Sequence, residues 1–238
     1  MRQLALGVSL RERASFDSFY TAAAPEAVQQ LRRLAAGRAG IVWLHGPSGA
    51  GKSHLLQAVC HACAPELRVG LFPLREIVST SEATQLSARL DGWQTLNVCC
   101  VDDVDVAVGL KPLELALFSL YRELDERRGV LIVSAQQPPT GFRWIVPDLG
   151  SRFAAAQVYR LRELDESEQA NALRQRAQMR GLQLPDETLR YLQRRFPRDM
   201  RSLCALLDKL DTASLAEQRR ITVPFIREVL GDAASTGC

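Results

Sequence analysis

Gly46, Gly51, Lys52 and Ser53 match the pattern G-x-x-x-x-G-K-S, which is typical of a phosphate-binding loop. Glycines allow a tight loop whose backbone N–H groups point at a phosphate. A helix beginning at Lys52 adds its positive dipole end, the lysine reaches the outer phosphates and the serine hydroxyl can hold Mg²⁺. A chance Gly-rich turn is the alternative, and the flanking apolar run 41–44 disfavours it. The predicted nucleotide-binding residues of this stretch are Gly46, Pro47, Ser48, Gly49, Ala50, Gly51, Lys52, Ser53 and His54.

Two carboxylates, Asp102 and Asp103, end an apolar run about 50 residues after this loop. A site for a phosphate and a metal ion requires such carboxylates opposite the phosphate-binding loop. Asp102 would orient Mg²⁺ through a bound water, and Asp103 would polarise an attacking water. A strand followed by an acidic turn is the structural alternative, but the distance from the loop favours the functional reading.

Alternating strand-like and helical segments would position these groups. In this sequence, Gly-rich and Pro-rich turns separate the helical segments from the strand-like segments. Strands that alternate with helices form mostly parallel sheets that are covered by helices on both faces. The sequence therefore predicts an α/β core. For residues 147–153 it predicts neither a helix nor a strand. The strand-like runs are 41–44, 69–72, 97–104, 129–135 and 157–161, and the helical runs are 26–34, the residues after Lys52, part of 75–90, and 112–127.

The composition changes at about Arg162, after which only helical patterns occur. Asp165, followed three residues later by Glu168, has the pattern of a capping box. We expect a tail at 1–15, an α/β nucleotide-binding core at 16–161 and a small all-α domain at 162–238. The four predicted helices run from Asp165 to Gly181, from Pro185 to Phe196, from Asp199 to about Gln218 and from Thr222 to Gly231.

The composition narrows the class of protein. A net charge of +3 is too mild to indicate nucleic-acid binding by itself. No apolar run approaches the ~20 residues that span a membrane, and the start of the chain lacks a signal peptide, so we expect a cytoplasmic protein without a membrane partner. Cys60 and Cys63, with His54 and His61 nearby, could suggest zinc. Their i, i+3 spacing on the helix after the loop favours core packing of reduced thiols instead.

With these parts placed, the chain resembles the AAA+ ATPases of the DnaA/Hda family, from about Phe16 to Gly231. The resemblance implies a P-loop NTPase core with a parallel sheet, followed by a helical lid domain. It rests on the phosphate-binding loop and on five further segments: Phe16-Asp-Ser-Phe19, Val101-Asp-Asp103, Gln136-Gln-Pro-Pro139 at the sensor-one position, Leu149-Gly-Ser-Arg-Phe153 at the arginine-finger position, and Asp199-Met-Arg-Ser-Leu203 at the sensor-two helix.

This resemblance assigns further roles. Arg152 would be an arginine finger that acts on a nucleotide held by another molecule, and Arg201 would be a lid arginine that contacts the chain's own nucleotide, with Arg198 as the alternative. Phe19 and Tyr20 would line the base, which is adenine by family likeness, and ADP or ATP is the implied cofactor. Gln136, at a position where the family usually has an acidic or amide group, would keep a hydrogen-bonding role near the phosphates.

Gln3, Leu4 and Leu6 in the tail resemble the motif by which the Hda branch docks on the DNA polymerase III sliding clamp (the β subunit). The chain also stops seven residues after Gly231, where DnaA continues into a DNA-binding domain. The resemblance implies a negative regulator that stimulates hydrolysis of DnaA-bound ATP and reaches DNA indirectly through the clamp. A stand-alone ATPase that acts as a loader or DNA remodeller, and a truncated initiator that binds DNA, are the alternatives. Oligomeric state and intrinsic turnover stay open.

Overall fold

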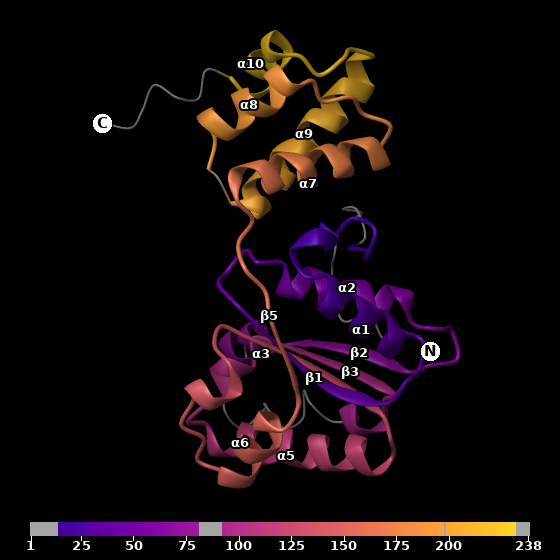
Figure 1. Cartoon of the computed structure of the whole chain (residues 1–238), viewed down its shortest axis with the longest axis vertical. Coiled ribbons are helices and arrows are strands. Elements are labelled where there is room, and N and C mark those ends of the chain that lie inside the picture. The colour runs from indigo at the N-terminus through magenta and orange to yellow at the C-terminus, as the bar shows by residue number, and fades with distance from the viewer. Residues whose placement is uncertain (1–13, 81–91, 198, 232–238) are drawn as a thin grey trace. The chain divides into compact units, whose positions relative to one another are not determined.

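The computed structural model describes residues 14–80, 92–197 and 199–231, apart from the side chain of residue 94. These residues form two compact units, which divide between Arg162 and Glu163 (Figure 1). Each unit has a hydrophobic core of its own.

The first unit is built on a five-stranded sheet in which every described pair of strands is parallel. The order across the sheet is β2-β3-β4-β1-β5. Parallel strands present all their carboxyl ends at one edge, and loops at that edge form the usual ligand-binding crevice of open α/β sheets. The strands are β1 (Gly40–His45), β2 (Val69–Pro73), β3 (Val98–Asp102), β4 (Val130–Ala135) and β5 (Gln157–Arg160).

Helices cover both faces of this sheet (Figure 1). One face packs against α1 (Pro25–Ala35) and α2 (Lys52–Ala62), and the other packs against α3 (Leu74–Thr80), α5 (Lys111–Glu126) and α6 (Pro147–Ala154). Short 3₁₀ turns complete the unit: η1 (Thr21–Ala23), η3 (Trp93–Thr95), η4 (Val104–Ala107) and η5 (Pro139–Gly141). The predicted α/β core is therefore confirmed.

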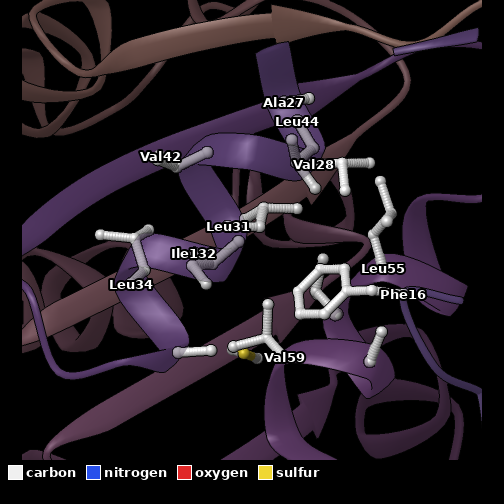
Figure 2. Packing of buried hydrophobic residues seen from close by; sticks show 14 of the residues in the cluster. Phe16, Ala27, Val28, Leu31, Leu34, Val42, Leu44, Leu55, Val59 and Ile132 are labelled. Atoms are coloured by element: carbon white, nitrogen blue, oxygen red, sulfur yellow. The ribbon is translucent and has the colours of Figure 1, made fainter. Parts of the chain in front are cut away.

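The core beneath α1 and α2 explains why this face is stable. Phe16, Leu31 and Leu55 converge on Val42 and Ile132 of the sheet (Figure 2), and all five side chains are at least 96% buried. Burying one such side chain stabilises a fold by about 1.5–3 kcal/mol before entropy is subtracted. Cys63, Cys99 and Cys100 are buried as well, in agreement with the prediction that these thiols pack in the core, while Cys60 is half-buried.

Helix α6 covers residues 147–153, for which the sequence predicts neither a helix nor a strand. Pro147 occupies the first helical turn, where its missing N–H costs nothing. Leu149 and Phe153, one turn apart, are both fully buried and fix the helix on the sheet. The spacing of these two residues is the signal that could have identified the helix.

The second unit is all-helical and contains α7 (Glu166–Met179), α8 (Asp186–Arg195), α9 (Met200–Glu217) and α10 (Val223–Leu230). Leu173, Leu192, Leu207 and Phe225, one from each helix, are buried together in its core. The predicted helical lid domain is thereby confirmed.

Side-chain caps start three of these helices. The predicted capping box is present, because Asp165 accepts the N–H of Glu168 at 2.8 Å and the Glu168 carboxylate accepts the N–H of Asp165 at 3.1 Å. Asp199 and Thr222 cap α9 and α10. Each such cap is worth about 1 kcal/mol of helix stability.

Candidate functional site

The phosphate-binding loop joins the carboxyl end of β1 to the start of α2, the position that the motif requires. Gly46, Gly49 and Gly51 have φ angles of 154°, 84° and 91°, which L side chains rarely adopt. A Cβ atom at Gly46 would also lie only 2.1 Å from the backbone oxygen of Leu161. The glycines are therefore needed for this backbone path.

Lys52 points back into the loop. Its Nζ donates hydrogen bonds to the backbone oxygens of Gly46, at 2.7 Å, and Pro47, at 2.8 Å, and the residue is only 7% exposed. Burial lowers the pKa of this ammonium group, and the charges of Asp103 and Asp102 oppose that shift. The structure therefore brings the loop lysine and the two predicted carboxylates together at one edge of the sheet, as an anion site requires.

Ser134 holds these two carboxylates in place. Its hydroxyl donates a hydrogen bond to Oδ1 of Asp102 and accepts the backbone N–H of Asp103 at 3.0 Å. The serine is fully buried near the end of β4, next to β3 in the sheet. Asp103 adopts a left-handed conformation with φ of 55°, which turns the chain after β3. One polar residue in an otherwise apolar strand thus fixes the geometry at Asp102 and Asp103.

Arg75, near the start of α3, lies across Asp103 and Asp105. Its Nε donates to Oδ2 of Asp103 at 2.8 Å, and a second guanidinium nitrogen lies 3.4 Å from Oδ2 of Asp105. The hydrogen bond to Asp103 raises the pKa of Arg75 further, so the group stays charged. Asp103, which we expect to polarise a water, is therefore held by a cation of its own chain.

The groups at this edge suit a magnesium nucleotide. Mg²⁺ prefers oxygen ligands and is usually bound by one or two protein groups together with phosphates and waters. The Ser53 hydroxyl at the start of α2 and the Asp102 carboxylate provide that set, and Lys52 adds a buried positive charge for the phosphates. The predicted donors therefore fit a polyphosphate and its metal ion.

Phe19 lies against this loop. A Cβ atom added at Gly51 would come within 2.7 Å of its ring, and its ring centroid is 5.8 Å from that of His54. The segment before it is fixed to α2, because Nε2 of His54 lies 2.9 Å from the backbone oxygen of Ser15. Phe19 is thus placed beside the loop, where a base could stack.

For two other predicted nucleotide-binding residues, the structure gives the position in the fold and the exposure. Tyr20 is half-buried at the start of η1. Gln136 is exposed directly after β4, at the same edge of the sheet as the loop.

Arg152 lies on the other side of the sheet, in the last turn of α6. Its guanidinium carbon is 5.6 Å from the centroid of the Phe118 ring and 5.5 Å from that of Tyr121, and both rings belong to α5. It forms no ion pair with any carboxylate in the part of the chain that the structure describes. Because α2 and α6 cover opposite faces, the sheet separates Arg152 from the helix that follows the chain's own phosphate loop.

Arg201 occupies the first turn of α9 and is exposed. It belongs to the second unit. Gln3, Leu4 and Leu6 lie outside the described residues, as does Arg198.

The sequence does not predict Arg75 and Ser134 as residues of this site. Ser134 could have been noticed, since it is the one polar residue in the apolar run 130–135. Arg75 gives no such signal, because charged residues are common at helix starts and its partners lie about 30 residues further along the chain.

Comparison with known proteins gives the family. The model of the bacterial DnaA ATPase domain matches residues 10–159, more than half of the chain, and the model described as Hda, lid domain, matches residues 165–230. No helix among the described residues is long and apolar enough to cross a membrane.

Solved structures of DnaA share the fold. Domain III of the Thermotoga maritima replication initiation protein DnaA is 20% identical, with a TM-score of 0.76, and the match covers 96% of this chain and 100% of that one. AMPPCP-bound DnaA from Aquifex aeolicus is 19% identical, with a TM-score of 0.67, over 84% and 66% of the two chains. A replication initiator DnaA bound to AMPPCP and single-stranded DNA is 16% identical, with a TM-score of 0.68, over 89% and 70%. The chain therefore belongs to the DnaA-related AAA+ ATPases and combines their ATPase domain with an Hda-type lid.

Proposed function

We propose that this protein is an Hda-like negative regulator of replication initiation. It binds an adenine nucleotide, docks on the DNA-loaded sliding clamp and presents Arg152 to ATP held by the initiator DnaA. Hydrolysis of that ATP then prevents a second initiation. The protein reaches DNA indirectly, through the clamp.

The bound nucleotide acts mainly as a conformational key. Lys52 and the loop glycines hold the phosphates, Phe19 and Tyr20 hold the base, and Gln136 and Arg201 add polar contacts. Ser53 and Asp102 hold Mg²⁺, which neutralises phosphate charge when it is bound. The two DnaA relatives solved with AMPPCP support an adenine nucleotide, ADP or ATP, as the ligand of this fold.

The observation that carries this proposal is the position of Arg152. Its guanidinium lies on the sheet face opposite α2, is half-exposed and stacks on two rings of α5. A permanently charged, planar group in this position suits phosphate oxygens supplied by another molecule. The match of the second unit to the Hda lid supports the regulatory branch of the family.

Clamp docking rests on the chemistry of the tail. Leu4 and Leu6 in an extended segment can enter an apolar groove, while the Gln3 amide hydrogen-bonds at its rim. A pull-down with sliding clamp tests this directly. The wild type should be retained, and a variant with Gln3→Ala and Leu4→Ala should be lost. Equal retention of both proteins would remove the clamp from the proposal.

The decisive experiment measures hydrolysis of DnaA-bound ATP in the presence of DNA-loaded clamp and this protein. Arg152→Ala should reduce the stimulation by about 10³-fold, the lower range of arginine fingers that act in trans. Arg33→Ala, another arginine in the last turn of a helix, is the matched control and should stimulate normally. Full stimulation by Arg152→Ala, with nucleotide and clamp binding intact, would refute the finger role.

A stand-alone ATPase is the second candidate function, and Asp103 favours it, since the charge of this carboxylate raises the pKa of the phosphate-loop lysine. Steady turnover by the isolated protein that Asp103→Asn abolishes would support this candidate. Turnover that is negligible without DnaA would support the regulatory one.

A further inference from the structure

One side of α5 contacts both ends of α6, the helix that carries Arg152. Glu114, Phe118 and Tyr121 follow one another at intervals of four and three residues, so they lie along the same side of this helix. Glu114 contacts the start of α6, and the two rings contact Arg152 in its last turn.

Glu114 fixes the start of α6. The residue is fully buried, and its two carboxylate oxygens accept the backbone N–H groups of Gly109 and Val146, each at 2.8 Å. Val146 is the residue before the helix, and its carbonyl accepts the N–H of Leu149 at 3.1 Å. A buried carboxylate bonded to two amides in separate loops holds those loops at a fixed separation, because losing either bond would leave a buried polar group unsatisfied.

The other end of α6 is fixed by Phe153, next to Arg152 in the chain. Its ring is fully buried and lies 5.8 Å from that of Tyr121 and 5.0 Å from that of Trp43, centroid to centroid. The backbone that carries Arg152 is therefore determined before any partner arrives, and only the arginine side chain retains rotational freedom.

Phe118 and Tyr121 restrict that remaining freedom. A guanidinium that stacks on ring faces is attracted by them while its N–H donors at the edge stay available. A carboxylate partner would also restrict the side chain, but it would neutralise the charge and compete with an incoming phosphate. Ring faces hold the cation without either cost.

Resting on the finger role proposed above, we propose that Phe118 and Tyr121 are positioning residues for Arg152. They align its guanidinium before DnaA docks, and Glu114 sets the helix on which it stands. The partner's phosphates then meet an arginine that has little rotamer freedom left to lose.

The test replaces Phe118 with 3,4,5-trifluorophenylalanine, which keeps nearly the same shape and removes the negative charge from the ring face. The maximal stimulated rate of DnaA-bound ATP hydrolysis should fall by about two- to fivefold, the range of an exposed cation–π contact. The protein concentration that gives half-maximal stimulation should not change. Phe118→Leu should fall as far, and Phe118→Tyr should restore the wild-type rate.

The matched control places the same fluorinated residue at Phe72, a ring of β2 that meets Trp93 edge to face, and its rate should equal that of the wild type. A wild-type rate with fluorinated Phe118, while Phe118→Leu is slow, would assign the ring to packing alone and overturn the inference. Arg152→Ala in the same assay separates this from failure of the proposed function. If Arg152→Ala stimulates hydrolysis fully, the finger role fails. If Arg152→Ala is slow but the protein with fluorinated Phe118 keeps the wild-type rate, only the positioning role fails.

Glu114→Gln supplies a second measurement, because an amide has one acceptor oxygen for two N–H groups. Faster hydrogen exchange at the Val146 amide, together with a reduced maximal rate, would support the anchoring role of Glu114. Unchanged exchange and rate would exclude it, and the Phe118 series remains decisive whether or not this variant folds.

Discussion

Lys52 and Arg152 are two cations of one domain that are held in opposite ways. Lys52 is buried within its own loop, bonded to two backbone oxygens and near three carboxylates. Arg152 is half-exposed on the far face of the sheet, held by two aromatic rings and by no described carboxylate. Both cations suit a phosphate, but in different surroundings.

This difference is consistent with two phosphates from different sources. Under the proposed function, a cation enclosed by the backbone of its own chain, among groups that suit Mg²⁺, would serve a ligand that this chain binds. Under the same proposal, a cation that is positioned but not neutralised would serve a ligand that arrives on another molecule.

The largest effect on nucleotide binding is expected at Lys52. Lys52→Ala should weaken ADP binding by about 100-fold, since it removes a charge-assisted contact to the phosphates. Arg152→Ala should leave the same affinity unchanged. Isothermal titration calorimetry on the folded variants measures both, and equal losses would mean that the two cations serve the same nucleotide.

Arg201 is a third cation, in the lid, and we expect it to contribute to the same nucleotide site as Lys52. Arg201→Ala should weaken ADP binding by about tenfold, the value of one hydrogen bond to a charged group. Arg194→Ala, an exposed arginine in the last turn of α8, is the matched control and should bind normally. An unchanged affinity for Arg201→Ala would remove this residue from the nucleotide site.

The loop around Lys52 could be predicted because its chemistry is local. A glycine-rich turn, a lysine and a serine occupy eight successive positions, and the backbone between a strand and a helix determines where they point. The position of Asp102 and Asp103 at the same edge of the sheet as the loop was predictable too, because parallel strands all end at one edge. The helical lid followed from periodicity and from caps such as Asp165 with Glu168.

The surroundings of Arg152 could not be predicted in the same way. Phe118 and Tyr121 look like ordinary members of an amphipathic helix, and their contact with a residue about 30 positions away depends on how α6 packs. Glu114 is still less visible, since a glutamate in a helix is normally solvated, whereas here it is fully buried. Contacts made across the fold leave no pattern in the sequence.

A substitution at Arg75 should change the chain's own nucleotide site without affecting Arg152. Arg75→Gln should raise ATP turnover by the isolated protein about two- to fivefold, because Asp103 loses an exposed ion pair of that strength and can polarise a water. A multiple-turnover phosphate-release assay measures it, with Arg122→Gln, which breaks an exposed pair with Glu126, as the control. In the background of Asp103→Asn the increase should vanish. A decrease for Arg75→Gln alone would instead assign Arg75 to phosphate binding.

The smallest effect is expected at Asp199, which caps the helix that carries Arg201. Hydrogen bonds from Ser202 lower the pKa of this carboxyl, so its ionised form stabilises the folded lid. Asp199→Asn keeps the cap but removes the charge, and should lower the protection of the first α9 amides by about 0.5 kcal/mol at neutral pH. Because the folded-state pKa is depressed, this contribution is complete above the ordinary aspartate pKa of about 3.9 and is lost as the pH falls through the folded value. Hydrogen exchange should therefore differ between the two proteins at pH 7 and converge in strong acid, whereas a constant difference would show that charge is not the cause.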